Sequence, residues 1–175
     1  IDLYDLQGTS NAEDLRLHFG GQIEGLYTAP RFKSAQGDGT VIGEHQWPAG
    51  QALGHDGAVD YLADFLRGQL GDHQLAAVGH RVVHGGMAYA APVRLNAEVV
   101  RDLEQFVPLA PLHQPHNLAP IQRLTERQPG LPQVACFDTA FHRAQPDIAQ
   151  MFALPTESHD AGVRRSGFHG LTSEY

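Results

Sequence analysis

Apolar residues recur along this chain with two different spacings, which divide it into a strand-rich beginning and a mixed remainder. Before about residue 50, short runs of branched and aromatic residues alternate with polar ones and end at Gly, Asn or Asp. That punctuation is typical of strands joined by turns, so we expect an antiparallel meander. The predicted strands cover residues 1–6, 25–28, 31–35 and 40–47.

Helical spacing begins near residue 55. Between His55 and Leu70, apolar side chains return every three or four positions with acidic residues between them, which predicts an amphipathic helix. A second helix is expected from Asn96, whose side chain suits a cap, through Phe106. Strands alternating with helices after a meander predict an α/β domain with a mixed sheet. The remaining predicted elements are strands over 74–84 and 133–137, a helix over 116–127 after a loop broken by Pro108, Pro111 and Pro115, and a helix that begins after Gly170.

Composition narrows the function classes. The 175 residues fit one domain, and no apolar run approaches the roughly 18 residues that a membrane span needs. A net charge of −8 argues against a nucleic-acid binder, and no secretory signal is visible, so we expect a cytoplasmic location. Cys136 is the only cysteine, and its apolar surroundings predict a buried structural thiol. Lys33 is the only lysine, which excludes a P-loop ending in Gly-Lys-Ser/Thr.

The run His80 to Gly86 holds the most informative chemistry. In a strand, side chains two residues apart share a face and lie about 6.6–6.8 Å apart, so Arg81 and Val83 would present a cation beside an apolar group. A small carboxylic acid could place its head on the guanidinium and its tail on the valine. The chain is therefore expected to handle a short carboxylate, together with phosphate.

Two further candidates lie where loops follow predicted strands or precede helices. Asp138 ends an apolar strand, where a carboxylate can hold Mg²⁺ or orient a nucleophile, or can simply cap the next helix. His113 lies in a loop that flanking prolines stiffen, beside the apolar Leu112. A loop histidine is commonly just solvated.

The segment Gly167 to Gly170 brackets an aromatic and an ionisable ring. Glycines on either side let the backbone present Phe168 and His169 close to a ligand. The preceding Arg164 and Arg165 either attract phosphate or form an ordinary solvated surface.

The hypothesis that His80 and His84 bind a metal ion is disfavoured. Their spacing of four suits two ligands on a helix, but the zinc-hydrolase pattern needs Glu after the first histidine, where this chain has Arg81. Satisfied strand or turn histidines are the better interpretation.

Four ordered blocks together resemble the acetate kinase family, the acetokinases. They are G-H-R-V-V-H-G-G, A-P-L-H-x-P-x-N-L, V-A-C-F-D-T-A-F-H and R-R-S-G-F-H-G-L-T-S-E-Y, and they run from about Val78 to Tyr175. The resemblance implies a mixed-sheet, ribonuclease H-like α/β domain of the superfamily that includes acetate and sugar kinases and actin. It implies the reversible reaction of acetate with ATP to acetyl phosphate and ADP, with Mg²⁺ (or Mn²⁺), in a full-length homodimer.

The resemblance also implies a role for each matching residue. Arg81 would bind the carboxylate and the transferring phosphoryl group, and Asp138 would be the catalytic aspartate, acting through metal or by orienting the nucleophile. His113 and His169 would contact the phosphoryl group, with His169 also at the nucleotide phosphates. The pocket for the substrate's methyl group would be lined by Val83, Leu112 and Phe168.

The departures from the family pattern set the alternatives. The family's opening strand with its N-A-G-S-S-S phosphate loop is not found before Ile1, and a carboxy-terminal nucleotide domain does not fit in this length. We therefore expect residues 1–175 to be part of an amino-terminal acetokinase domain, inactive by itself. Gln114 stands where relatives have asparagine, and Met87 where many have an acid. The alternatives are a propionate or butyrate kinase of the same family and a non-catalytic module.

Overall fold

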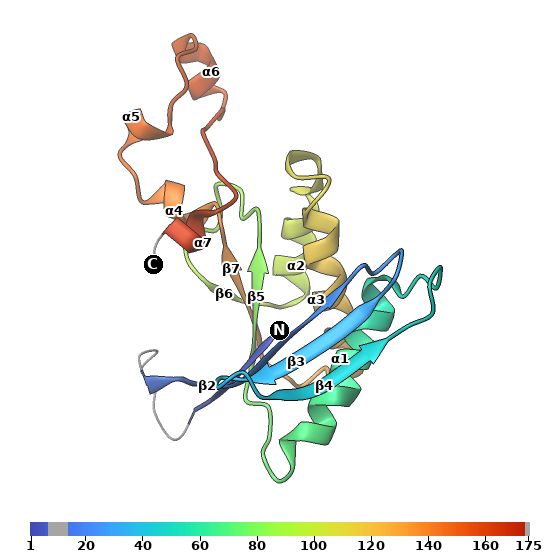
Figure 1. Ribbon diagram of the computed structural model, residues 1–175. Helices are drawn as coiled ribbons and strands as arrows, with labels where there is room; N and C mark the ends of the chain where they lie inside the picture. Colours follow the sequence, from blue (N-terminus) through green and yellow to red (C-terminus); the bar gives the residue numbers. More distant parts are fainter. Residues whose placement is uncertain (7–13, 174–175) are drawn as a thin grey trace. The chain divides into compact units, whose positions relative to one another are not determined.

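The protein divides into two compact units. The computed structural model describes residues 1–6 and 14–173, and its contacts separate residues 1–67 from residues 68–175. Figure 1 labels the helices and strands of both units. Within the described residues, no helix combines the length and apolar character that crossing a membrane requires.

The first unit is an antiparallel meander with a helix packed against it, as predicted. The sheet order is β1-β2-β3-β4, with every neighbouring pair antiparallel. Phe32 of the third strand is buried, and its ring lies 4.7 Å from that of Phe65 and 5.1 Å from that of Tyr61 in the helix. The elements are β1 (Asp2–Asp5), β2 (Arg16–Glu24), β3 (Arg31–Gln36), β4 (Val41–Gln46) and α1 (Gly54–Leu70), the last of which runs across the boundary between the units.

One strand of this unit was not predicted, and one predicted strand does not form. The strand β2 contains Gly20 and Gly21, and such a glycine pair is typical of a turn. A Cβ on Gly21 would lie 3.0 Å from Lys33 O, so a glycine here allows close approach of β3. The strand predicted over 25–28 is wrong, because Gly25 has a φ of +63° and its carbonyl accepts the Thr28 N–H in a turn.

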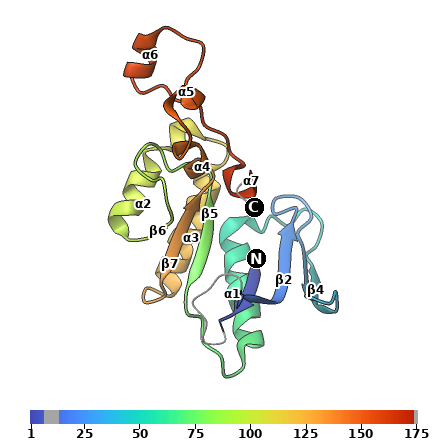
Figure 2. The ribbon, with the colours of Figure 1, turned by 90° about the vertical axis from the view of Figure 1, so that its left-hand side faces the viewer.

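The second unit contains a small mixed sheet, which confirms the predicted α/β arrangement. Its order is β5-β7-β6; β5 and β7 are parallel, and β6 pairs antiparallel with β7. Figures 1 and 2 show α2 and α3 beside this sheet and α4 and α7 at the end of β7. The elements are β5 (Val78–Val82), β6 (Val93–Arg94), α2 (Ala97–Glu104), the 3-10 turn η2 (Val107–Leu109), α3 (Gln114–Arg127), β7 (Gln133–Phe137), α4 (Ala140–Arg143), α5 (Asp147–Gln150), α6 (Thr156–Asp160) and α7 (Gly170–Ser173).

The core of the second unit joins one face of the sheet to α2 and α3. Asn96 caps α2 as predicted, because its side chain accepts the N–H groups of Glu98 and Val99. Along β7, burial alternates with the period of two that one covered face requires. The buried core residues are Val82, Val99, Leu103, Leu118, Ile121, Ala135 and Phe137.

Two predicted boundaries are wrong here. The strand predicted over 74–84 covers only Val78–Val82. Strand alternation therefore ends before Val83 and does not support the prediction that Arg81 and Val83 share a face, and Arg81 is exposed whereas Val83 is buried. The helix predicted from 116 begins at Gln114, because Pro115 fits its first turn, where the missing N–H costs nothing. An arm over 144–166, which carries α5 and α6, leads from α4 towards α7 (Figure 1).

Candidate active site

Arg81 and Asp138, two of the predicted site residues, lie at the carboxyl ends of β5 and β7. Because these strands are parallel and paired from Val78–Gln133 to Val82–Phe137, their carboxyl ends meet at one edge of the sheet. Asp138 directly follows β7, and its N–H donates to Val82 O at 3.1 Å. This edge is therefore where the second unit can bring distant chemistry together.

An ion pair between Arg81 and Asp138 forms the centre of the site. Arg81 Nε donates to Asp138 Oδ2 at 3.0 Å, and Arg81 Nη2 donates to the carbonyl oxygen of Phe168 at 3.1 Å. Asp138 is fully buried, whereas the Arg81 side chain is 54% exposed. The arginine is thus fixed from one side, while the rest of its guanidinium fork can receive an anion from solvent.

Asp138 is not the cap of the following helix, which corrects the simpler interpretation of its position. The helix α4 begins at Ala140 with Thr139 at the cap position. The second Asp138 oxygen, Oδ1, accepts the N–H of Leu171 in α7 at 3.4 Å. The carboxylate therefore ties β7 both to Arg81 and to the segment that carries Phe168.

Glycine at position 170 is what permits this approach. A Cβ on Gly170 would overlap Asp138 O and would lie 2.7 Å from the Cβ of Phe141. Only the absence of a side chain lets α7 begin against the end of β7. The pair of glycines around His169 is therefore explained in part by packing.

The loop after β5 is held by side chains rather than by a neighbouring strand. Its four consecutive N–H groups, from residue 83 to residue 86, each donate to a different side chain, so none is left unpaired after the ladder ends. The four bonds are Val83 N to Asn117 Oδ1 at 2.9 Å, His84 N to Gln114 Oε1 at 3.2 Å, Gly85 N to Thr139 Oγ1 at 3.0 Å and Gly86 N to His84 Nδ1 at 2.9 Å.

His84 is held in its neutral form by this loop. Its Nδ1 accepts the Gly86 N–H, so Nε2 carries the ring hydrogen. Burial, and secondly the charge of Arg143, lower the pKa of His84. Its ring lies between those of Phe106 and Phe168, with centroid distances of 5.8 and 5.9 Å.

The three other histidines singled out in the sequence comprise one near the site, one apart from these contacts and one with a structural role. The His113 ring lies 5.9 Å from the Phe168 ring. His169 is exposed, and its carbonyl accepts from both Ser173 N and Ser173 Oγ. The His80 ring lies 2.7 Å from the side-chain oxygen of Gln133, and burial lowers the pKa of His80. These contacts agree with the interpretation of His80 as a strand histidine with a hydrogen-bond partner.

The three residues predicted to line the apolar pocket differ in exposure. Val83 is buried and Phe168 half-buried, whereas Leu112 is 79% exposed. Cys136 is half-buried, and burial raises the pKa of its thiol, in line with an unreactive structural role.

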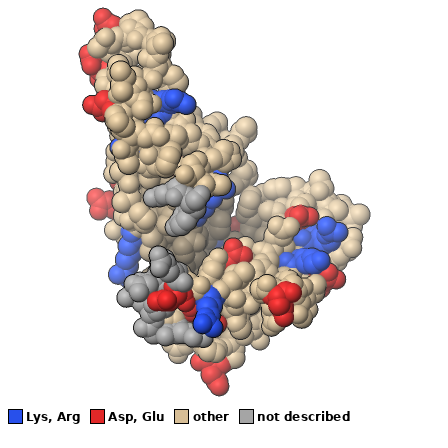
Figure 3. All heavy atoms as spheres, turned by 60° about the vertical axis from the view of Figure 1, so that its left-hand side comes forward, with Lys and Arg blue, Asp and Glu red and all other residues tan. Residues whose placement is uncertain are grey.

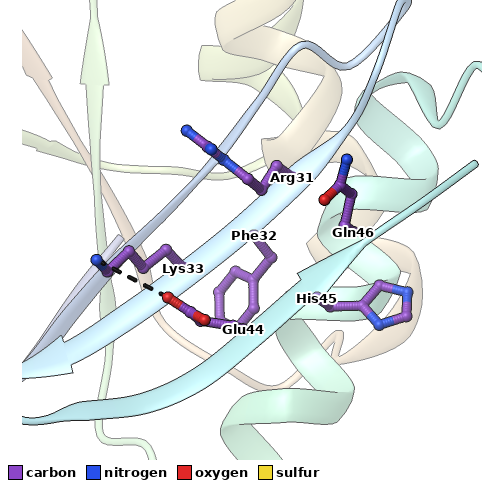
Figure 4. Close-up of a pocket in the computed structure, with 6 residues that line it drawn as sticks. All are labelled: Arg31, Phe32, Lys33, Glu44, His45 and Gln46. Atoms are coloured by element: carbon purple, nitrogen blue, oxygen red, sulfur yellow. Dashed lines mark ion pairs between the residues drawn. The ribbon is translucent and has the colours of Figure 1, made fainter. Parts of the chain in front are cut away.

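A separate hollow lies in the first unit, on β3 and β4 (Figure 4). It has a volume of about 400 Å³, and none of the predicted site residues lines it. Its two cations are already paired, since Lys33 Nζ lies 3.8 Å from Glu44 Oε1 and Arg31 lies 3.5 Å from Glu24. The lining residues are Arg31, Phe32, Lys33, Glu44, His45 and Gln46.

The part of the chain that the structure describes shows no cluster of potential metal ligands. Among residues 1–6 and 14–173, no three His, Cys, Asp or Glu side chains converge. Each oxygen of the buried Asp138 accepts one N–H bond, and a carboxylate oxygen can take more than one partner, so a role of Asp138 at Mg²⁺ stays a prediction. On the face drawn in Figure 3, acidic and basic side chains are interspersed.

Similarity to solved structures defines the class of fold. A propionate kinase from Francisella tularensis superposes with a TM-score of 0.80 and 30% identity, over 94% of this chain and 42% of that chain. The acetate kinase of Porphyromonas gingivalis gives a TM-score of 0.77 and 30% identity over the same shares. The expected domain of the acetate and sugar kinase/actin superfamily is confirmed.

Similarity in sequence defines the family. The chain is 47% identical to the acetate kinase of Rhodopseudomonas palustris over 155 residues, and 44% identical to that of Rhizobium meliloti over 162 residues. These matches cover 89% and 93% of this chain but 38% and 41% of the relatives, so the chain spans about two fifths of their length. The acetokinase family profile matches residues 20–175, and the chain belongs to that family.

Proposed function

We propose that this chain supplies the carboxylate-binding part of an acetate kinase, which makes acetyl phosphate from acetate and ATP, reversibly. In the forward reaction a carboxylate oxygen of acetate attacks the γ-phosphorus of ATP. An O–P bond forms, the bond to the bridging oxygen breaks, and ADP leaves with that electron pair. The single observation that carries the proposal is the Arg81 guanidinium, fixed by Asp138 and Phe168 O while more than half exposed.

Arg81 would stabilise negative charge and would not serve as a general base or acid. Acetate is already ionised near neutral pH and needs no general base, so the demand is to hold two anions together and to stabilise the charge on the equatorial phosphoryl oxygens. A guanidinium whose position is fixed in advance meets that demand without reorganising. We assign Asp138 the role of orienting Arg81, because the Asp138 carboxylate is fully buried and accepts the Arg81 Nε–H.

The remaining roles are proposals that family resemblance supports. His113 and His169 would donate to the phosphoryl oxygens, with His169 also at the nucleotide phosphates. Val83, Leu112 and Phe168 would contact the acyl tail. Mg²⁺ (or Mn²⁺) would enter as the complex with ATP, in the cytoplasm, and the full-length protein would act as a homodimer.

The test uses the full-length polypeptide that carries this chain. Acyl phosphate formed from acetate and MgATP is trapped with hydroxylamine and compared for wild type, Arg81→Ala and the control Arg94→Ala, an exposed arginine on β6. Loss of a fixed donor to a developing charge lowers turnover about 10²–10³-fold, so Arg81→Ala should fall by that much and Arg94→Ala should not. Equal activities, or no acyl phosphate from wild type, contradict the proposal, and the second result favours a non-catalytic module.

A propionate kinase is the second candidate, favoured by the superposition on the Francisella tularensis propionate kinase. One methylene in an apolar pocket changes discrimination by only about 10–200-fold. The ratio of kcat/KM for acetate and propionate therefore decides between the two.

A further inference from the structure

We infer that the first turn of α3 sets the length of acyl tail that the site accepts, through Gln114 and Asn117. Both side chains hold the backbone after β5, and Asn117 binds the N–H of Val83, the residue proposed to contact the tail. They would be positioning residues, since neither is proposed to touch the substrate. This inference rests on the proposed function.

Gln114 joins three segments of the chain through one buried amide. Its Oε1 accepts from His84 N, and its Nε2 donates to His84 O at 3.0 Å and to Leu103 O at 3.1 Å. The side chain is fully buried, where a polar group is stable only when its bonds are made. Because Gln114 directly follows His113, the same residue fixes the loop after β5 and the start of the helix that carries the predicted phosphoryl contact.

The support of Val83, one proposed wall of the tail pocket, differs from the support of the Arg81 guanidinium. Arg81 is held by Asp138 and the carbonyl of Phe168, whereas the backbone of Val83 and His84 is held by α3. A change in α3 should therefore move the wall of the pocket and leave the guanidinium in place. The expected result is altered discrimination between short acids. In Gln114→Asn a lower kcat for both acids should accompany it, because Gln114 also fixes the start of the helix next to His113.

A matched control lies at the other end of the same sheet. Gln133, at the amino end of β7, is also buried and also uses both ends of its amide, with His80 at 2.7 Å and Thr125 Oγ1 at 2.8 Å. Gln133→Asn makes the same chemical change as Gln114→Asn. It should disturb packing to a similar degree without reaching the loop at residues 83–86.

The experiment measures kcat/KM for acetate and for propionate, and KM for ATP, in the full-length protein. Gln114→Asn and Asn117→Ala should change the acetate-to-propionate ratio by about tenfold, the lower end of one methylene's effect, with KM for ATP within about twofold. Asn117→Asp should keep the wild-type ratio, because its carboxylate still accepts the Val83 N–H. Gln133→Asn should also keep it.

Two outcomes separate this inference from the proposed function. Wild-type protein that forms no acyl phosphate overturns the proposed function, and the inference with it. Active wild type whose ratio is unchanged in Asn117→Ala, or is changed equally by Gln133→Asn, overturns the inference alone. Should Gln114→Asn fail to fold, the half-buried Asn117 pair of variants decides the question.

Discussion

Arg81→Met and Asp138→Asn remove opposite halves of one ion pair, and the structure predicts unequal costs. Asp138 is fully buried, and without Arg81 its carboxylate would keep only the 3.4 Å bond from the Leu171 N–H. In the converse variant the guanidinium is left unpaired, but it is 54% exposed and can turn to water. The free energy of unfolding should therefore fall further in Arg81→Met.

The burial of each partner sets the magnitudes. Breaking a fully buried pair costs about 3–5 kcal/mol, and breaking an exposed pair about 0–1 kcal/mol. Because solvent screens the cationic half of this pair, we expect about 2–3 kcal/mol for Arg81→Met. Asp138→Asn replaces the carboxylate acceptor of the Arg81 Nε–H by a neutral amide oxygen, so the ion pair is lost, and it should cost about 1 kcal/mol. In the Asp138→Asn background no carboxylate is stranded, so Arg81→Met should add less than about 1 kcal/mol.

Native-state hydrogen exchange of the amides in β7 is the suitable assay. It reports the local free energy of opening in the second unit and does not require the two units to unfold together. Arg94→Met, on the exposed position of β6, is the matched control and should stay within about 0.5 kcal/mol of wild type. Equal costs for the two single variants, or a larger cost for Asp138→Asn, would refute the reasoning.

Three further predictions concern the same unit. Asn96→Ala should destabilise α2 by about 1 kcal/mol, because it removes the acceptor for two N–H groups, and Asn96→Asp should retain the wild-type stability. Hydrogen exchange of the α2 amides measures both effects. Gly170→Ala should lower turnover of the full-length enzyme at least about 100-fold. The added Cβ forces α7 away from Asp138, and misplacing a site by about 1 Å can cost that much in rate. Near-normal kinetics would contradict this prediction. Stability should fall as pH drops below about 6.5, because the unfolded chain gains a proton that folded His84, with its lowered pKa, resists. His84→Asn should reduce that slope in unfolding measured from pH 5 to 8, and His80, whose pKa is also lowered, contributes in the same direction.

Periodic elements were predictable because their signals are local. The helix over residues 54–70 repeats its apolar positions over several turns, and β7 is a short apolar run that ends at Asp138. The strand β6 has only two residues, too few to show any period. The end of β5 depends on partners 30 or more residues away, so its length could not be inferred from its own composition.

The sequence predicts candidate site residues but not the contacts between them. Arg81 and Asp138 were each proposed as functional groups, yet they are separated by 57 positions, and nothing in either motif indicates that they form a pair. Phe168 was proposed for its ring, whereas the bond to Arg81 comes from its carbonyl oxygen. A backbone acceptor carries no signal in the residue type.

Gln114 was considered only as a departure from a family pattern, although a physical signal was present. It precedes Leu118 by four positions and Ile121 by seven, which places it on the buried stripe of α3. A polar residue on such a stripe needs hydrogen-bond partners for its amide when the helix packs. In this fold the partners are the backbone of His84, just after β5, and the carbonyl of Leu103. The helix pattern therefore identifies the residue, and only the fold identifies the loop that it holds.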